Sequence, residues 1–388
     1  MAFLLGLANV PTRNTDRRRP LTSALRDRGS GWRERPAHNV TKQVRGTPAS
    51  RTFGAALTTM SAVSTTTRVA SLPFAKYEGL GNDFILVDER HQPETSLTPA
   101  SAVRLCDRHF GIGADGVIIA LAPTQPDTDL RMRIFNSDGS EPEMCGNGIR
   151  CLAKFLAETD ADAAPTRRYR VQTLAGLIVP ELLPDGQVCV DMGAPVLEPA
   201  AVPARLPATS SFEGVPVAVE TTLDEDTARL PHPPATGGEH RWQVTAVSMG
   251  NPHCILFVDE ATWQWADAHL DAIGPQFEHH PAFPQRTNTE FVQVCGERKL
   301  RVLVWERGAG RTLACGTGAC ATVVAAMLAG VIPRTRHLPV SGTGAAPPPD
   351  TCLVYLPGGP LHIEWRLRDQ HVLMTGPARR VFAGEVST

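Results

Sequence analysis

Short apolar runs separated by turn residues recur along the chain from about residue 73 onward. Runs of this length, bounded by Gly, Pro, Asn or Asp, predict buried β-strands, because strands are short and turns favour these residues. The expected strand-like segments are residues 117–120, 130–135, 169–182, 187–192, 243–248, 254–258, 288–294, 300–306, 352–356, 361–365 and 371–375.

Four longer segments have the apolar spacing or composition of helices. They are residues 99–110, 149–156, 263–277 and 319–329. The first is expected to end before Gly111, since glycine is a common helix terminator. Strands and helices together predict a mixed α and β protein.

Two glycine-rich turns lie in the first third of the chain. The turn at residues 79–82 would let the backbone and the Asn82 amide approach a ligand, although a plain hairpin turn explains it almost equally well. The glycines of residues 111–116 precede a strand and open no helix. They are therefore not a dinucleotide-binding fingerprint.

Size and charge limit the class of protein. With 388 residues the chain is long enough for two domains. Its formal net charge of −2 provides no basic footprint for nucleic acid. It contains no apolar run of about 18 residues, which a membrane helix requires. We therefore expect no nucleic-acid partner and no membrane span.

The first 70 residues differ from the rest of the chain. They hold 12 Lys or Arg but 3 Asp or Glu, and they are rich in Ser and Thr. This composition is typical of organelle transit peptides and cannot bury a core. We assign residues 1–72 to a disordered transit peptide addressed to the plastid stroma, with mitochondrial import and a plain basic tail as alternatives.

Nine cysteines are spread over the chain without a paired framework, which favours free thiols in a reducing compartment. Two of them share a context. Cys145 begins the sequence Cys-Gly-Asn-Gly, Cys315 begins Cys-Gly-Thr-Gly, and each is followed by a helix-like run. A helix start offers unpaired N–H groups and positive potential, so it favours a thiolate and can bind an anion.

Two such thiols, if they face each other, can act on opposite faces of one carbon, one removing a proton and the other supplying one. This is the chemistry of a racemase or epimerase that works by two bases. Three alternatives stay open: a metal site that adds Cys151 and Cys320, a redox pair, and plain packing. The spacing fits structural zinc sites poorly, so we expect no metal.

At three motifs the chain resembles diaminopimelate epimerase, an enzyme of lysine biosynthesis that uses no cofactor. The motifs are residues 135–148 (Phe-Asn-Ser-Asp-Gly-Ser-Glu through Met-Cys-Gly-Asn-Gly), 250–253 (Gly-Asn-Pro-His) and 306–318 (Glu-Arg-Gly through Ala-Cys-Gly-Thr-Gly). The resemblance implies an α/β (α+β) fold of two pseudo-symmetric domains, each a β-barrel-like sheet around a central helix, with the active site in the cleft. It implies an N-terminal domain made of residues 73–192 together with residues 377–388, and a C-terminal domain made of residues 193–376.

The resemblance also implies the reaction, which interconverts LL- and meso-2,6-diaminopimelate. Cys145 and Cys315 would be the acid/base pair, while His253 and Glu306 would set the protonation states of the thiols. The implied substrate contacts are Asn82, Asn136, Gly146, Asn147, Asn251, Asn288, Glu306, Arg307, Gly316 and Thr317. A homodimer is left open.

Other interpretations and departures from the family pattern accompany this one. A two-cysteine racemase of another amino acid, or a thiol redox or binding protein on the same fold, would share the cysteine motifs. Residues 203–240 and 333–350 are rich in Pro and lie outside the compact family pattern. We expect both to be surface insertions without a role in the chemistry.

Overall fold

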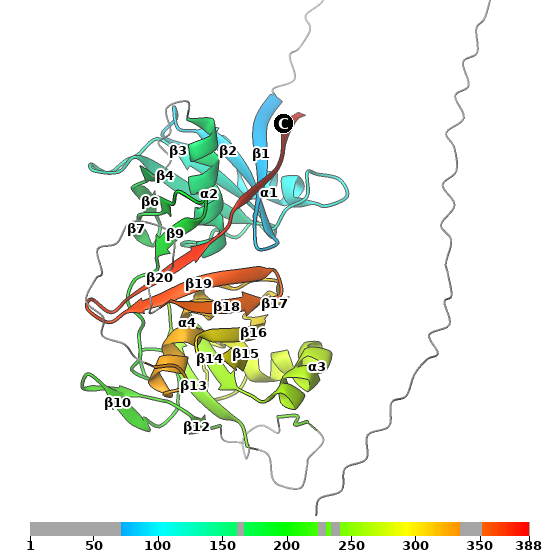
Figure 1. Ribbon diagram of the computed structural model, residues 1–388. Coiled ribbons are helices and arrows are strands. Elements are labelled where there is room, and N and C mark those ends of the chain that lie inside the picture. The colour runs from blue at the N-terminus through cyan, green and yellow to red at the C-terminus, as the bar shows by residue number, and fades with distance from the viewer. Residues whose placement is uncertain (1–70, 161–166, 224–229, 234–240, 334–350, 388) are drawn as a thin grey trace, which may run out of the picture. The chain divides into compact units, whose positions relative to one another are not determined.

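The computed structural model describes residues 71–160, 167–223, 230–233, 241–333 and 351–387. These residues form a mixed α/β structure with two large sheets, a small hairpin and four helices (Figure 1). The predicted class of structure is therefore confirmed. Of the predicted transit peptide, residues 1–70 lie outside the described residues, while Ser71 and Leu72 are the first residues of a strand.

The first sheet has seven strands. In spatial order they are β21 (Arg379–Ser387), β1 (Ser71–Gly79), β2 (Asn82–Glu89), β3 (Gly116–Leu121), β4 (Leu130–Asn136), β6 (Val171–Thr173) and β7 (Gly176–Ile178). β21 runs antiparallel to β1 from the Ser71–Ser387 pair onward. The last strand of the chain thus completes the sheet that the first described strand begins.

The second sheet has twelve strands. In spatial order they are β12 (Thr221–Thr222), β13 (Gln243–Ser248), β14 (Pro252–Phe257), β15 (Asn288–Gly296), β16 (Lys299–Glu306), β18 (Cys352–Leu356), β19 (Gly359–Arg366), β20 (His371–Gly376), β9 (Val188–Asp191), β8 (Glu181–Leu182) and β5 (Arg167–Arg168), with β17 (Gly310–Arg311) paired to β16. β20 and β21 follow each other in sequence and belong to different sheets, as the red strands in Figure 1 show.

Two helices lie against the sheets with most of their surface covered. α2 (Gly146–Thr159) packs on β1, β2 and β9, and α4 (Gly316–Leu328) packs on β13, β14, β15 and β19. Nearly every residue of α4 is buried. A helix that is apolar on all sides is stable only inside a core, so α4 is the centre of its sheet and α2 has the same place in the first.

The other two helices cover outer faces. α1 (Pro99–Cys106) packs on β3 and β4, and α3 (Glu260–Glu278) packs on β15 and β16. The prediction of a helix over residues 99–110 was too long at its end. The Asp107 carboxylate accepts hydrogen bonds from the backbone N–H groups of His109 and Phe110, which forms a turn and stops the helix.

One strand order occurs twice. β1, β2, β3 and β4 pair antiparallel, parallel and antiparallel, and β13, β14, β15 and β16 pair in the same sequence. In the strand registers, Phe84 of β2 pairs with Gly116 of β3, and His253 of β14 pairs with Asn288 of β15. Each set leads into a central helix. We call the two sets the first half and the second half.

The predicted surface insertions are partly ordered. Residues 203–223 contain the hairpin of β10 (Ser210–Phe212) and β11 (Val215–Val217). The Phe212 ring lies 4.9 Å from the Trp365 ring, between centroids, so this segment is packed onto β19. Its assignment as a plain surface excursion was incomplete, because its apolar residues reach the core. Residues 224–229, 234–240 and 334–350 lie outside the described residues.

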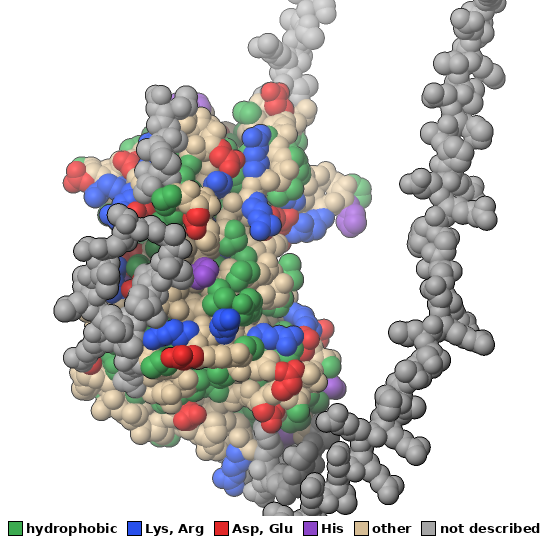
Figure 2. All heavy atoms as spheres, in the orientation of Figure 1, with side chains coloured by type: hydrophobic (Ala, Val, Ile, Leu, Met, Phe, Trp, Pro, Cys, Tyr) green, Lys and Arg blue, Asp and Glu red, His purple; other side chains and the backbone are tan. Residues whose placement is uncertain are grey.

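Charged side chains of both signs are interspersed on the face shown in Figure 2. Among the described residues, no helix combines the length and the apolar character that crossing a membrane requires.

Candidate active site

Cys145 and Cys315 each cap the N-terminus of a central helix. The Sγ atom of Cys145 accepts a hydrogen bond from Gly148 N, and that of Cys315 accepts one from Gly318 N, both at 3.4 Å. Both cysteines have extended backbone angles, as N-cap residues do. Each sulfur therefore lies where the helix supplies N–H donors and positive potential, as the sequence predicted.

The two helix starts meet. The Asn147 side chain in the first turn of α2 donates from Nδ2 to Ala314 O, the carbonyl just before Cys315, at 3.1 Å. Met374 of β20 lies between them: a Cβ on Gly146 would be 3.0 Å from Met374 Cε, and one on Gly316 would be 3.1 Å from Met374 Sδ. The glycines after each cysteine thus allow both helices to close on one methionine.

The electrostatic surroundings of the two thiols differ. Burial raises the pKa of Cys145, while hydrogen bonds from the backbone and the charge of Arg150 lower it. Burial also raises the pKa of Cys315, and the carboxylates of Glu306 and Glu290 add to that rise, so it lies well above its usual value. The Glu306 carboxylate thus raises the pKa of both thiols, whereas Glu290 adds to the rise at Cys315 and Arg150 opposes the rise at Cys145.

Asn82 lies beside Cys145 at the start of β2. Its Nδ2 donates to Asp115 at 2.8 Å, and its Oδ1 accepts from Asn147 Nδ2 at 3.1 Å. The Cys145 thiol approaches the same Oδ1 at 3.9 Å. Asp115 in turn accepts a hydrogen bond from Arg108. The amide of Asn82 is therefore held between a carboxylate and the first turn of α2.

In the second half, three side chains form a line at the start of β14 and β15. His253 Nδ1 lies 2.7 Å from Glu290 Oε1, and His253 Nε2 lies 3.0 Å from Asn251 Oδ1. His253 and Glu290 are both fully buried, with 0% exposure of their side chains. The two predicted residues, Asn251 and His253, are thus in contact through the imidazole ring.

Glu306, at the end of β16, lies next to Cys315. It accepts hydrogen bonds from the Thr312 hydroxyl and from the Cys315 thiol. Burial raises the pKa of this carboxyl, and those two hydrogen bonds oppose the rise. Its charge also affects Cys145. The Glu306 charge therefore raises the pKa of both thiols, while its role in setting their protonation states stays a prediction.

Asn288, at the start of β15, and Arg307, directly after the end of β16, are joined by a hydrogen bond. Asn288 donates from Nδ2 to Pro252 O at 2.9 Å and accepts from Arg307 N at 2.9 Å. The Arg307 guanidinium donates to Gln285 O at 3.2 Å. Thr317 lies at the cysteine itself, with its Oγ1 3.4 Å from Cys315 Sγ.

Asn136 is the predicted residue with the weakest link to the others. Its side chain donates to Ser140 Oγ at 2.9 Å, within its own turn. It is tied to the site through the strand register, because it pairs with Gly116 next to Asp115.

Three contributors were missed from sequence: Glu290, Asp115 and Thr312. Glu290 carries the clearest signal that could have been used, since it is the one charged residue in the segment that forms β15, two positions after Asn288 and directly before the apolar Phe291 and Val292. A charge at such a position is rare unless it is paired. Asp115 and Thr312 lie in glycine-rich loops, where polar residues are ordinary, so the sequence alone does not distinguish them.

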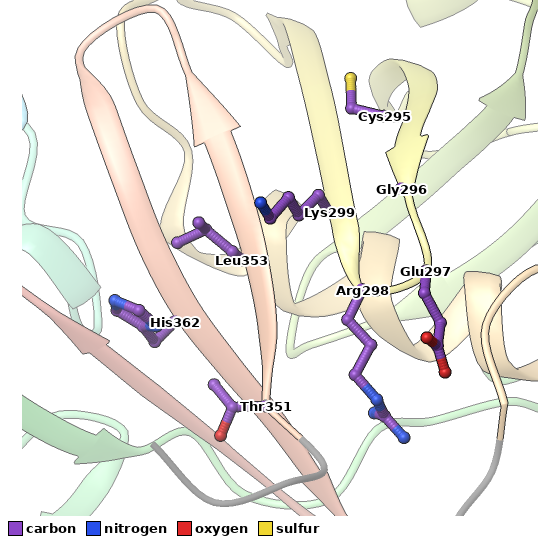
Figure 3. A pocket seen from close by; sticks show the side chains of 8 residues that line it. All are labelled: Cys295, Gly296, Glu297, Arg298, Lys299, Thr351, Leu353 and His362. Atoms are coloured by element: carbon purple, nitrogen blue, oxygen red, sulfur yellow. The ribbon is translucent and has the colours of Figure 1, made fainter. Parts of the chain in front are cut away.

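A surface hollow lies at the opposite ends of β15 and β16. Cys295, Gly296, Glu297, Arg298, Lys299, Thr351, Leu353 and His362 line it (Figure 3). Neither Cys145 nor Cys315 is among these residues, so the hollow is separate from the paired cysteines.

The fold is shared with solved structures of low sequence identity. A probable proline racemase from Agrobacterium radiobacter K84 superposes with a TM-score of 0.52 at 14% identity, covering 81% of this chain and 92% of that one. A hydroxyproline epimerase from Agrobacterium vitis gives 0.50 at 14%, covering 81% and 91%. These two matches show that the chain shares its fold with both proteins.

Sequence comparison identifies the family to which the chain belongs. The family model of diaminopimelate epimerase matches residues 74–198 and 245–381. A diaminopimelate epimerase from Synechocystis is 55% identical over 316 residues, which are 81% of this chain and 99% of the relative. One from Synechococcus elongatus is also 55% identical over 316 residues, with 81% and 98% covered. The chain belongs to the diaminopimelate epimerase family.

Proposed function

We propose that this protein interconverts LL- and meso-2,6-diaminopimelate, with Cys145 and Cys315 as the two bases and without a cofactor. The observation that carries the mechanism is the meeting of two cysteine-capped helix starts, tied by the hydrogen bond from Asn147 to Ala314. The substrate is supported by the cyanobacterial relatives, which are 52–55% identical and bear the name diaminopimelate epimerase.

In each direction one cysteine acts as a thiolate and the other as a thiol. The thiolate sulfur takes the α-proton and becomes a thiol, and the electron pair left on the α-carbon is delocalised towards the carboxylate. The opposite thiol then donates its proton to the other face and becomes the thiolate. The N–H groups of both helix starts supply positive potential where this negative charge develops.

The polar residues around the cysteines would hold the rest of the substrate. Asn82, Asn136, Asn251 and Asn288 offer amide donors and acceptors, and Arg307 offers a guanidinium for a carboxylate. His253 and Glu306 would adjust the protonation of the thiols, and Glu306 is well suited because it accepts a hydrogen bond from the Cys315 thiol.

The test is proton exchange in heavy water. The purified, reduced protein, without added pyridoxal phosphate, should introduce deuterium at the α-carbon of diaminopimelate and equilibrate the LL and meso forms. A panel of other amino acids serves as the control for substrate. Absence of exchange with diaminopimelate would reject the proposal, and exchange with a different amino acid alone would point to a racemase of that substrate.

We also propose that residues 1–70 are a plastid transit peptide and that the enzyme serves lysine biosynthesis in the stroma. The family match begins at residue 74, and the relatives above are cyanobacterial. The basic, Ser- and Thr-rich composition of residues 1–70 supports a role in plastid import. A fusion of residues 1–70 to a fluorescent protein should enter plastids, whereas entry into mitochondria would overturn the location.

A further inference from the structure

The side-chain amide of Asn147 uses both of its hydrogens in contacts with the protein. Its Nδ2 atom donates to Asn82 Oδ1 and to Ala314 O, each at 3.1 Å. An asparagine amide has two N–H donors, so these two bonds occupy both of them. The side chain is 4% exposed, and its Oδ1 atom is buried without a hydrogen-bond partner among the described residues. A substrate could therefore meet this side chain through its oxygen alone.

The orientation of this amide is fixed by groups that cannot turn over. Ala314 O is a backbone carbonyl, which only accepts hydrogen bonds, so the Asn147 atom that faces it must be the nitrogen. The Asn82 amide is fixed in the same way, because one end lies 2.8 Å from the Asp115 carboxylate, which is paired with Arg108 at 2.7 Å. That end must be the nitrogen, so Asn82 presents its oxygen to Asn147. Reversing either amide would place two acceptors against each other.

The two bonds join the halves next to both sulfurs. Asn147 lies two residues after Cys145, and Asn82 Oδ1 is 3.9 Å from the Cys145 sulfur. The Ala314 carbonyl belongs to the same peptide unit as the nitrogen of Cys315. Because a peptide unit is planar, holding its oxygen restrains the residue that follows. The Asn147 side chain therefore restrains the start of α4 relative to the start of α2.

Thr317, the counterpart of Asn147 in the second half, lies against its own cysteine. It also follows the cysteine by two residues and is flanked by glycines, but its Oγ1 atom is 3.4 Å from Cys315 Sγ. Both helix starts are capped by a cysteine sulfur. An amide at this position is therefore not needed to begin the helix, and the bridge to Ala314 is a separate feature of the first half.

We propose that Asn147 is a positioning residue whose side chain bridges the two halves and sets the separation of the Cys145 and Cys315 sulfurs. This inference rests on the proposed function, in which both sulfurs must reach one carbon from opposite faces. Met374, which lies between the helix starts, limits how closely they approach, and the bridge limits how far apart they move. Because both partners of Asn147 are protein atoms, the bridge needs no substrate to form.

The first experiment measures the separation of the sulfurs in the full chain without substrate. Dibromobimane links two thiols that lie close together, and mass spectrometry of the peptides gives the fraction of singly labelled protein that goes on to join Cys145 to Cys315. Asn147→Leu keeps the branched shape and removes both donors. We expect it to lower the linked fraction by about tenfold, since intramolecular reactions depend steeply on the geometry of the reacting atoms. Rates of single labelling correct for changes in thiol reactivity.

Thr322→Val is the matched control. Thr322 is fully buried further along α4, its hydroxyl has no hydrogen-bond partner among the described residues, and valine has nearly the same shape. This variant should leave the linked fraction and kcat unchanged. Asn147→Leu should lower kcat for epimerisation of diaminopimelate by about 10–10²-fold, with a smaller change in KM, because it misplaces the acid and the base.

Two outcomes of these measurements would overturn the proposal. A linked fraction for Asn147→Leu equal to that of the wild type, together with a higher KM, would make the side chain a substrate contact. An equal fall of the linked fraction in Thr322→Val would show a general loosening of α4.

A measurement on the wild-type protein covers the case in which Asn147→Leu does not fold. In protein labelled with ¹⁵N-asparagine, both Nδ2 hydrogens of Asn147 should exchange with heavy water far more slowly than those of exposed amides, since both are bonded and buried. Rapid exchange would overturn the proposal. The proposed function is judged separately, because failure of wild-type exchange at the α-carbon rejects the reaction, whereas an active enzyme without the bridge rejects only the role of Asn147.

Discussion

The two halves share a framework but surround their cysteines with different chemistry. Asn136 and Glu306 each lie at the end of the fourth strand, and each is followed nine residues later by the helix-capping cysteine. The corresponding residues, first half before second, are Asn82 and Asn251, Phe84 and His253, Gly116 and Asn288, Ile118 and Glu290, Asn136 and Glu306, and Cys145 and Cys315.

The difference between the halves is electrostatic. The first half contributes one buried cation, Arg150, which lowers the pKa of Cys145, while Glu306 of the second half raises it. The second half places two carboxylates, Glu290 and Glu306, near Cys315. A two-base mechanism needs one thiolate and one thiol at the same time. The asymmetry teaches how a duplicated framework can give two chemically identical side chains different acid strengths.

The largest expected effect comes from replacing either catalytic cysteine, because this removes the acid/base group that its half contributes. Cys145→Ser and Cys315→Ser should each lower kcat for epimerisation by about 10²–10⁴-fold, because a serine hydroxyl is a far weaker acid than a thiol and each sulfur serves one face. Cys151→Ala and Cys320→Ala are the controls, since these buried thiols lie inside the same two helices. Near-normal turnover in either serine variant would refute the two-base assignment.

The second prediction measures the asymmetry directly. Alkylation by iodoacetamide follows the thiolate fraction, which rises with pH through the pKa. Because Glu290 raises the pKa of Cys315 and Arg150 lowers that of Cys145, Cys145 should react faster than Cys315 at neutral pH. Glu306→Gln should shift the Cys315 profile to lower pH. Mass spectrometry of the labelled peptides reports each site, and coincident profiles would contradict the comparison.

The third prediction concerns the glycines that allow the sulfurs to cap their helices. A Cβ at Gly318 meets the fixed Glu290 Oε1 at 2.5 Å, whereas one at Gly148 meets the Ile118 Cδ1 methyl at 2.8 Å, which can rotate away. Gly318→Ala should therefore destabilise by about 1–3 kcal/mol. Gly148→Ala should cost about 1 kcal/mol or less, since alanine is also a better helix former.

Urea unfolding of both variants provides the measurement for this third prediction. Equal losses of unfolding free energy would mean that Glu290 is free to move.

The smallest expected effect is that of the buried cation. Arg150 has 0% exposure and donates to Gly146 O at 3.2 Å and to Pro377 O at 3.3 Å. Removing its charge with Arg150→Met should raise the pKa of Cys145, so its alkylation profile should move to higher pH, slowing labelling about threefold at neutral pH. The Cys315 profile is the internal control. An unchanged Cys145 profile would show that Arg150 acts structurally.

Local patterns were sufficient for the central helices, most of the long strands and the cysteines, but not for the β10–β11 hairpin. The strands that enter the turns before Cys145 and Cys315 and the helices that leave them follow from apolar runs, glycines and helix-start signals close in sequence. Helix α1 was predicted four residues too long because the turn formed by Asp107 depends on side-chain hydrogen bonds that its apolar pattern does not reveal. The domain boundaries given above stay predictions.

The sequence by itself determined that two cysteines begin two helices, and the family motifs around them determined which substrate to propose. Only the tertiary structure decided that Met374 separates the two helix starts, that Asn147 reaches Ala314, and that Glu290 holds His253. The physical reason is distance along the chain. Capping is a contact between residues three apart, whereas these contacts join residues 37 to more than 200 positions apart, brought together by sheet pairing and helix packing.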